Sequence, residues 1–451
     1  MSDAESSGGL SDDGCSSGAG GPARDSAPKV RPGADWQDTL RGMCEGMRLS
    51  WPIRVILPCA GWDAPSQALQ AMGVEHTVVG AWDTDANCVP VWREVHGLEP
   101  HKPLPSQFHA GRRGDVQKVK LRQLPDADLL VSGPACRPIS SQGMGRTFAD
   151  PRSATLLTVL RWIFHLAARC LRCFVLENVM GMRSRRAGGK APADEVVAKL
   201  RRRLPGWHIE VAICDSQCSG QSRKRVYVVG YVKTRSAWRT PLQEAVPRLP
   251  ARPLSAIIDR SVPNGSLRDA RAGFRKNLQK YMQRLERELH DPRFRGQYAV
   301  IEISRNPDKR WGARARVDDR CPRLRARLAD LFIISLGEGE RPAVLRFLHE
   351  DEAAALQGMS AGIIPPGMSR GLVFRGLGNA MTVPVVGAVM LVALSRAMGM
   401  PDPPRKRRRA ESGDSDTDCE DQLAADSSDD GCDSTGGGSA STSGDESSSS
   451  S

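Results

Sequence analysis

Short apolar runs alternate with segments of helical spacing along the middle of this chain, and this alternation limits the folds that it can adopt. Runs of strand length and strand composition lie at residues 53–57, 76–82, 128–132, 173–177, 208–213 and 225–232. Apolar residues recur at the spacing of amphipathic helices in the intervening segments 65–73, 153–171 and 193–204. Strands that alternate with helices predict an α/β fold whose mainly parallel sheet is covered on both faces.

Both ends of the chain differ from this middle in composition. Residues 1–48 are rich in Ser, Gly, Asp and Pro and contain almost no large apolar side chains. Because such a segment cannot bury enough surface to offset the entropy lost on ordering, we expect it to be disordered. Residues 401–451 have the same character, with a basic cluster at 405–409 followed by an acidic, Ser-rich end. The basic cluster is typical of a nuclear-import signal and predicts a nuclear location, although such a cluster also attracts phosphate groups.

A basic stretch at residues 233–340 interrupts the alternation. Within it, residues 278–291 have the spacing of an amphipathic helix. Ordinary core patterning returns at residues 341–400, which include a long apolar run at 381–398. We therefore expect one main domain built from residues 49–232 and 341–400, with residues 233–340 inserted as a smaller domain. The apolar run contains a proline and ends at an arginine, which favours a buried helix over a membrane span.

The charge balance favours a polyanionic partner. The 451 residues carry a formal net charge of +12, and many of the cations lie in the middle of the chain. Nucleic acid is therefore a more probable partner than an acidic small molecule. The 12 cysteines are scattered and no secretion-signal pattern is seen at the start, so we expect reduced thiols without disulfides. Cys170 and Cys173 lack a second pair at zinc-ligand spacing, and no metal site is predicted.

Three strand ends carry residues suited to a nucleoside-bearing cofactor. After the first strand, Cys59 to Gly61 form a small-residue turn before a helix, which points backbone N–H groups at a ligand. Asp83 ends the second strand, where an acidic residue can hold a pair of ribose hydroxyls. Asp115, on a third loop, can accept a hydrogen bond from an exocyclic amine. Since the carboxyl ends of parallel strands share one edge of the sheet, these loops together predict a ligand site there.

A further strand end carries one cysteine, Cys136, on a loop between two prolines. A lone cysteine is more often a small buried side chain than a nucleophile. Here the prolines stiffen the loop, and Glu177 ends the next predicted strand along the chain. A free thiol has a pKa of about 8.5 that nearby cations lower, and Arg223 or Arg225 would supply such a charge. These features favour a nucleophilic thiolate over a structural thiol.

The order of these motifs resembles that of the cytosine-5 DNA methyltransferase family. The family's hallmarks run as a glycine turn, an acidic ribose binder, a Pro-Cys loop, Glu-Asn-Val, Gln-x-Arg-x-Arg, Leu-Gln-Gly and Gly-Asn-Ala. Between residues 51 and 398 this sequence has them as CAGWDA, WDTD, GPACRPISSQG, LENVMGM, GQSRKRVYVVG, AALQGM and GLGNAMTVP. The resemblance implies a Rossmann-like class I methyltransferase fold, in which the basic insertion is the target-recognition domain.

The resemblance also implies a reaction, DNA (cytosine-5-)-methylation, and a cofactor, S-adenosylmethionine. Because position 5 of cytosine is a weak nucleophile, a thiolate first adds to C6 of a base flipped out of the duplex, and this role falls to Cys136. Glu177 would act on N3 of the ring, with Arg223 and Arg225 at the flipped base and the catalytic loop. The residues expected to bind the cofactor are Cys59, Ala60, Gly61, Trp62, Asp63, Asp83, Asp115, Pro134 and Asn379.

The sequence departs from the family pattern at two places. The glycine turn usually has an aromatic residue and further glycines, whereas Cys59, Asp63 and Ala64 stand there. We expect the Asp63 carboxylate to accept a hydrogen bond from the amino group of the cofactor. Ala135 and Arg137 flank the catalytic cysteine where proline and glutamine are usual, so Arg137 would assist the thiolate or bind a phosphate.

Two other functions stay open. One is a cytosine-5 methyltransferase that acts on transfer RNA, although that branch normally has threonine where this chain has Ser140. The other is an inactive methyltransferase-like scaffold that binds DNA. Retention of the motif residues speaks against the scaffold, because an idle site has no chemical reason to keep them together.

Overall fold

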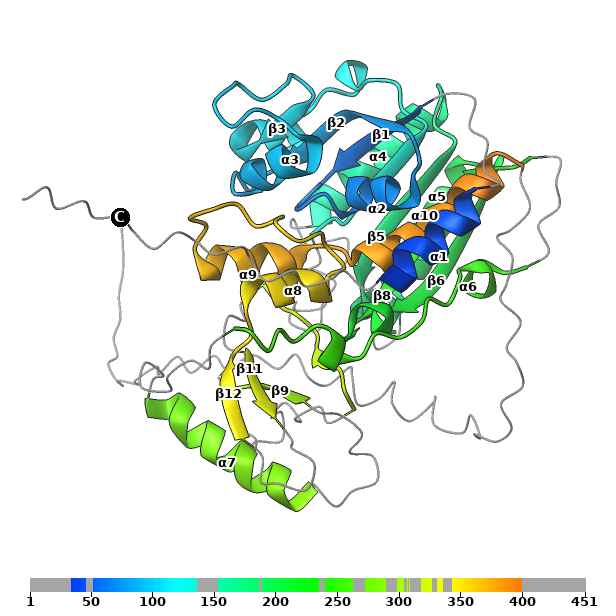
Figure 1. The fold of residues 1–451 in the computed structure, drawn as a ribbon. Coiled ribbons are helices and arrows are strands. Elements are labelled where there is room, and N and C mark those ends of the chain that lie inside the picture. Colours follow the sequence, from blue (N-terminus) through cyan, green and yellow to red (C-terminus); the bar gives the residue numbers. More distant parts are fainter. Residues whose placement is uncertain are drawn as a thin grey trace, which may run out of the picture.

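The computed structural model describes residues 34–45, 52–135, 153–185, 189–234, 240–262, 272–288, 298–303, 306, 308, 318–326, 331–335 and 343–399. These residues form a large α/β unit and a smaller unit below it in the view of Figure 1. The large unit is built on a seven-stranded sheet, and the smaller unit on a three-stranded sheet with helix α7 packed against it.

The large sheet has seven strands, and all of them except the short strand Phe108–Ala110, which was not predicted, lie where the sequence predicts them. The seven strands are β1 (Ile53–Pro58), β2 (His76–Asp83), β3 (Phe108–Ala110), β4 (Leu129–Ser132), β5 (Cys173–Val179), β6 (Trp207–Asp215) and β8 (Lys224–Val232). Their spatial order is β3-β2-β1-β4-β5-β8-β6. All neighbouring strands are parallel except that β8 runs antiparallel to both β5 and β6. The predicted, mainly parallel α/β sheet is therefore confirmed.

The strand order reverses its direction between β1 and β4. From β1 the chain moves outward to β2 and β3, and from β4 it moves outward on the other side to β5. Loops that leave two such central strands diverge, which opens a crevice at the carboxyl ends of the strands. The turn after β1 and the segment after β4 therefore border the same crevice.

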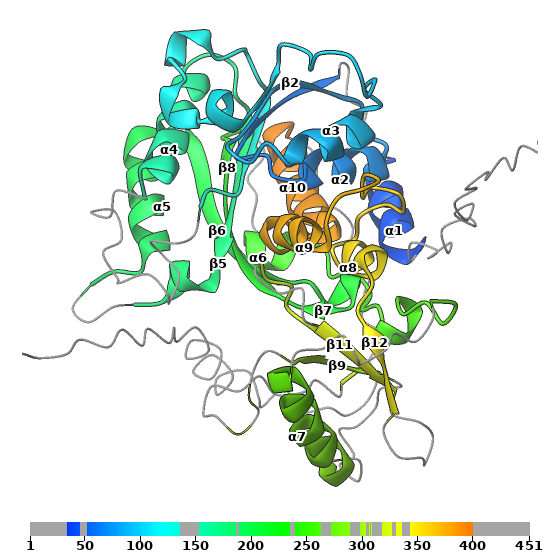
Figure 2. The same ribbon diagram turned by 90° about the vertical axis from the view of Figure 1, so that its left-hand side faces the viewer.

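Helices cover both faces of the large sheet (Figure 2). One face carries α1 (Ala34–Cys44), α2 (Ala64–Met72), α3 (Cys88–His96) and α10 (Val383–Ala397), and the other carries α4 (Ala154–Ala167) and α5 (Pro192–Arg203). Every residue of α10 is buried, so the apolar run predicted as a buried helix is one. Length and composition alone would also let the helical segment Arg370–Ala397 cross a membrane, but 89% of its most apolar window is buried inside the protein.

The prediction that residues 1–48 are disordered is wrong for residues 34–44, which form α1. Trp36 and Leu40 lie four residues apart on one face of this helix, and both are buried against the large unit. Gly387 of α10 leaves room for this contact, since a Cβ there would come within 3.0 Å of Leu40 Cδ1. Average composition misses such a helix because one apolar face is enough to dock it onto an existing core.

The smaller unit has a core of its own. It contains α7 (Ala272–Glu288), β9 (Tyr298–Glu302), β11 (Leu331–Ser335) and β12 (Ala343–Phe347). The central strand β11 is antiparallel to both neighbours. Leu278, Tyr281 and Leu285 lie on one face of α7 and pack against Ile301 and Phe332 of the sheet.

The boundaries of this unit differ from the predicted 233–340. Strand β12 ends at Phe347, so the unit extends beyond residue 340. At the other end, α6 (Leu242–Ala245) and the residues Leu254 and Ile257 are buried in the core of the large unit. Their apolar side chains complete that core, so the smaller unit begins later than its change in composition indicates.

Two short strands join the units. Strand β7 (Gln221–Ser222) belongs to the large unit and pairs in parallel with β10 (Cys321–Pro322). Helices α8 (Glu350–Leu356) and α9 (Arg370–Asn379) then return the chain to the carboxyl edge of the large sheet. Segments distant in sequence thus converge beside the crevice.

Candidate active site

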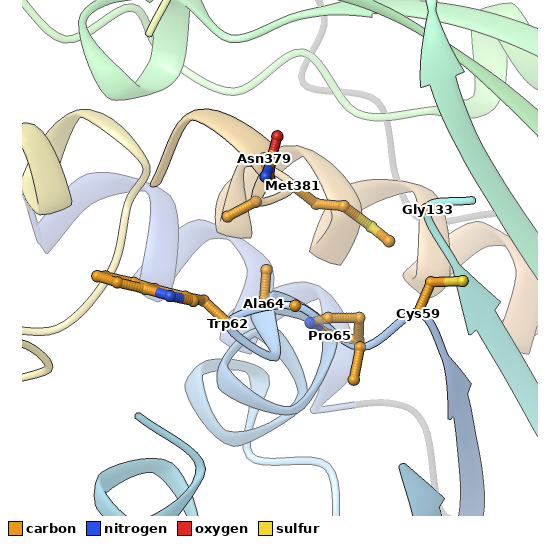
Figure 3. Close-up of a pocket in the computed structure, with 10 residues that line it drawn as sticks. Cys59, Trp62, Ala64, Pro65, Gly133, Asn379 and Met381 are labelled. Atoms are coloured by element: carbon orange, nitrogen blue, oxygen red, sulfur yellow. The ribbon is translucent and has the colours of Figure 1, made fainter. Parts of the chain in front are cut away.

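A cleft opens at the switch point, between the turn after β1 and the end of α9. It spans about 260 Å³, open solvent included. Figure 3 shows Cys59, Trp62, Ala64 and Pro65 on the side of the turn, facing Asn379 and Met381. The remaining lining residues are Ala60, Gly61, Gly133 and Ala380. Five of the residues predicted to bind the cofactor therefore lie around one cleft, namely Cys59, Ala60, Gly61, Trp62 and Asn379.

The turn after β1 is held by hydrogen bonds to its backbone. Cys59, Gly61 and Asp63 have φ angles of 60°, 53° and 50°, in the left-handed region that favours glycine. For the two residues that are not glycine this conformation costs about 1 kcal/mol or more each. Hydrogen bonds offset that cost, because Gly61 N donates to Asp83 Oδ2 at 2.8 Å and Trp92 Nε1 donates to Gly61 O at 2.9 Å. The turn keeps its shape although the usual glycines are missing.

Asp63 does not act as predicted. Its side chain is fully buried and is not among the groups that line the cleft. Oδ1 accepts a hydrogen bond from Ser66 N at 3.1 Å, which caps the start of α2, and Oδ2 lies 2.7 Å from His96 Nε2. The expectation that this carboxylate accepts from the cofactor is therefore wrong, because both of its oxygens already have partners inside the protein.

Asp83 lies at the cleft edge with its carboxylate fixed. Its oxygens accept from Gly61 N and from Asp85 N, each at 2.8 Å. Burial raises the pKa of Asp83, and the two backbone donors oppose that rise. Because each carboxylate oxygen has two lone pairs, the group can still accept hydrogen bonds from ribose hydroxyls.

Asp115 caps a short 3-10 helix, Val116–Lys118. It accepts from Gln117 N at 3.1 Å and lies 3.5 Å from Lys118 Nζ. The loop before it approaches the end of β2 closely, since a Cβ on Gly114 would come within 1.9 Å of Asp83 O. The predicted third loop therefore lies next to the second, although Asp115 does not line the cleft.

Cys59 is one of the residues that line the cleft (Figure 3). Burial raises its pKa to about 12, with the Asp83 carboxylate adding to the rise. The thiol is therefore neutral at physiological pH. Because the thiolate is the reactive form, Cys59 is not a competing nucleophile in this cleft.

A carboxylate and a guanidinium meet at the carboxyl end of β5. Glu177 is 8% exposed, and Arg225 Nε on β8 lies 2.9 Å from its Oε1. The sheet brings them together, since Val179 pairs with Arg225 and residues 177 and 179 point to the same face of β5. A Cβ on Gly133 would lie 3.4 Å from Glu177 Oε2 and 3.1 Å from Met381 Cε. Glu177 is thus close to the wall of the cleft.

Cys136 lies outside the described residues, which end at Ala135 on this loop. The start of the loop is nevertheless fixed, because Asn178 Nδ2 donates to Pro134 O at 3.1 Å. The predicted cofactor residue Pro134 is held by this bond and does not line the cleft, which its neighbour Gly133 does. The sequence reasoning missed the role of Asn178, although its place directly after Glu177 in Glu-Asn-Val was a usable signal.

Arg223 does not lie where the sequence predicts it. It falls between β7 and β8, is 2% exposed, and donates to the carbonyl oxygens of Leu324, Gly378 and Ala380. Burial lowers the pKa of Arg223 to about 9, so the group stays charged at neutral pH. The expected place at the flipped base is corrected, since this guanidinium is bound to backbone inside the protein.

Residues of three motifs form one buried network. Gln221 Nε2 donates to Gln357 Oε1 at 3.0 Å and to Leu356 O at 2.6 Å. Thr382 Oγ1 also donates to Gln357 Oε1, at 3.0 Å, and Gln357 Nε2 donates to Leu377 O. Gln221 and Gln357 are fully buried, so each of these bonds satisfies a group that cannot reach water. The network connects the strand β7 to both ends of the segment that carries Asn379.

Comparison with known proteins identifies the family. The sequence profile of C-5 cytosine-specific DNA methylases matches residues 59–393, which is more than half of the chain. The chain belongs to this family. The motifs seen in the sequence are therefore those of this family, and the family implies the use of S-adenosylmethionine.

The curated relatives match part of this chain. The orphan methyltransferase M.Rho11sI of Bacillus phage rho11s is 27% identical over 180 residues, which are 40% of this chain and 33% of the relative. The type II methyltransferase M.NlaX of Neisseria lactamica is 28% identical over 130 residues, 28% of this chain and 39% of the relative. The chain thus matches between a third and two fifths of the length of these relatives.

Solved structures share the fold of this chain. S. pombe Dnmt2 methyltransferase superposes with a TM-score of 0.52 at 16% identity, over 76% of this chain and 98% of that one. Entamoeba histolytica methyltransferase EhMeth gives 0.51 at 13% identity, over 77% and 99%. Across the described part of the chain, no group of three His, Cys, Asp or Glu side chains is placed to hold a metal ion.

Proposed function

We propose that this chain transfers a methyl group from S-adenosylmethionine to C5 of a cytosine in DNA. The observation that carries the proposal is the Glu177–Arg225 pair, which lies beside Gly133 at the start of the Cys136 loop and next to the cleft. An acid, a cation and a cysteine loop are thus adjacent to a site for a nucleoside-bearing cofactor.

The hydrogen-bond donors and acceptors around the cleft match those of the cofactor. The turn after β1 presents backbone N–H groups at a switch point, and the adjacent Asp83 carboxylate has free lone pairs for ribose hydroxyls. Asn379 and Met381 would hold the opposite side. When bound there, S-adenosylmethionine supplies an electrophilic methyl group next to the target base.

The residues of the chain would activate the base. The Cys136 thiolate forms a bond to C6, and the electron pair of the C5–C6 double bond moves through the ring toward N3. Glu177 donates a proton or a hydrogen bond at N3, which leaves C5 nucleophilic. Arg225 keeps Glu177 oriented. After methylation the N3 proton returns to Glu177, a solvent water molecule takes the C5 proton, and the C6–S bond breaks with its electron pair leaving on the Cys136 sulfur, which restores the aromatic ring.

The net charge of +12 and the family itself support DNA as the substrate. A base stacked in a duplex must be flipped to reach Glu177, so the pocket needs a cationic surface around it that binds the backbone of the nucleic acid. The smaller unit, with its basic helix α7, would supply part of that surface.

Covalent trapping tests the proposal. The full chain is incubated with S-adenosylmethionine and duplex DNA that contains 5-fluorocytosine, whose fluorine blocks release of the enzyme. We expect a denaturation-resistant adduct with the wild type and with the control C170S, and none with C136S. E177Q should form the adduct about 10² to 10⁴ times more slowly, as expected for loss of a general acid.

The same experiment with transfer RNA separates the alternatives. An adduct on RNA and none on DNA would move the assignment to the transfer-RNA branch. A folded protein that forms no adduct on either nucleic acid would contradict the proposal and favour the inactive scaffold.

A further inference from the structure

Arg223 stands apart from the other arginine of its motif. Arg225 faces the Glu177 carboxylate, whereas no carboxylate among the described residues forms an ion pair with the Arg223 guanidinium. Its Nη1 and Nη2 instead donate to three backbone carbonyls, at 2.8 Å to Leu324 O, 3.1 and 3.2 Å to Gly378 O, and 2.8 Å to Ala380 O. These contacts belong to two chain segments far apart in sequence.

The first of these segments is a wall of the cofactor cleft. Gly378 and Ala380 flank Asn379, and Asn379, Ala380 and Met381 line the cleft (Figure 3). Arg223 therefore holds the backbone on both sides of Asn379. A displacement of this backbone would move the cleft wall directly.

The second segment, residues 318–326, lies between β9 and β11 of the smaller unit, and we call it the strap. Its strand β10 pairs with β7. The backbone N–H and the backbone carbonyl of Leu324 both form hydrogen bonds with residues of the large unit. Leu324 N donates to Gln221 Oε1 at 3.4 Å, and Leu324 O accepts from Arg223 Nη1. The strap also touches the cleft wall, since a Cβ on Gly378 would come within 2.2 Å of Ala326 N.

We propose that Arg223 is a positioning residue that fixes the Gly378–Ala380 wall of the cofactor cleft against the strap of the smaller unit. The inference rests on the proposed function, because it concerns the same cofactor site. Arg223 would set cofactor affinity without touching the base.

The shape of the side chain matches this role. A guanidinium presents several donors in a flat, rigid fork, so one group can bind carbonyls that point from different directions. A lysine ammonium has three donors on a flexible stem and cannot reproduce the fork. The backbone that carries the side chain is also fixed, because Asp215 Oδ1 accepts a hydrogen bond from the Arg223 backbone N–H at 2.8 Å.

Binding of S-adenosylhomocysteine to the purified full chain tests the proposal, measured by calorimetry on R223K. We expect the Kd to rise about tenfold or more, since lost hydrogen bonds to a charged group weaken the wall. In steady-state assays the KM for S-adenosylmethionine should rise, with kcat within about threefold of the wild type. An arginine that contacted the base would instead lower kcat and leave cofactor binding unchanged.

The matched control is R346K. Arg346 is also buried, at 4% exposure, and also joins the units, through Glu352 and the carbonyl of Asp259. Its hydrogen-bond partners do not line the cleft, so R346K should lower the melting temperature but change the Kd less than about twofold. An equal rise in Kd for both variants would overturn the specific role of Arg223.

A second variant keeps the test decisive if R223K does not fold. G378A retains Arg223 but pushes the strap away from the wall, because its Cβ would clash with backbone at Ala326. We expect the same loss of affinity. Wild-type Kd values in a folded R223K or G378A protein would overturn the inference, whereas a wild-type protein that binds no S-adenosylhomocysteine would contradict the proposed function itself.

Discussion

The turn after β1 and the buried network around Gln357 both support the cofactor cleft, yet they do so in different ways. At the turn, the positions that usually hold an aromatic residue and glycines carry Cys59 and Asp63, and hydrogen bonds between the Gly61 backbone and the side chains of Asp83 and Trp92 keep the shape. In the network, the motif side chains Gln221 and Gln357 themselves carry the hydrogen bonds. A site whose shape depends on hydrogen bonds to its backbone therefore tolerates new side chains. A site whose shape depends on hydrogen bonds between side chains does not.

The largest effect is expected from Q357L, which removes the centre of the network. The variant leaves the Gln221 amide, the Thr382 hydroxyl and the Leu377 carbonyl buried without this partner. Because each unsatisfied buried group costs about 1 to 3 kcal/mol, the free energy of unfolding should fall by about 3 kcal/mol or more. Urea denaturation measures it, with Q123L at an exposed position as the control. Equal stability of the two variants would contradict the side-chain role of the network.

A smaller effect is expected at Asp63, where two variants separate the cap from the backbone conformation. D63G loses the hydrogen bond to Ser66 N and the contact with His96 but suits the left-handed φ of 50°, so we expect a loss of about 1 kcal/mol. D63A also has the strain of that φ, which should cost about 1 kcal/mol more. The Kd for S-adenosylhomocysteine should stay within about twofold in D63G. A large loss of affinity in D63G would show that the side chain, and not the backbone, shapes the turn.

The smallest effect concerns pH and the hydrogen bond from Gly61 N to Asp83. Burial raises the pKa of Asp83, so its carboxylate takes up a proton at a higher pH than an ordinary aspartate does. Affinity for S-adenosylhomocysteine should therefore be complete above that raised pKa and fall as the pH drops through it, by at most about tenfold per pH unit. Calorimetry across the acidic range measures the loss. D83N should bind more weakly but show no such dependence, and an equally steep fall in D83N would assign the titration to another group.

Much of the fold could be predicted from local patterns. Each predicted strand appears in the sheet, because a run of apolar, β-branched residues has no other way to bury both faces. The neighbourhood of Glu177 and Gly133 also follows, since parallel strands place their carboxyl ends along one edge. By contrast, α1 could not be predicted, because its burial depends on α2 and α10, which complete its core only after folding.

The sequence by itself determined the order of the motifs, the strand ends that carry Cys59, Asp83 and Glu177, and the family. Tertiary structure alone decided which polar groups still have free hydrogen-bonding capacity. Asp63 and Arg223 have the right chemistry for a ligand, but both are buried with partners inside the protein. The physical reason is that the role of a polar side chain depends on which groups already form hydrogen bonds with it. For Arg223 those partners are backbone carbonyls from residues about 100 and 155 positions away, which no local pattern records.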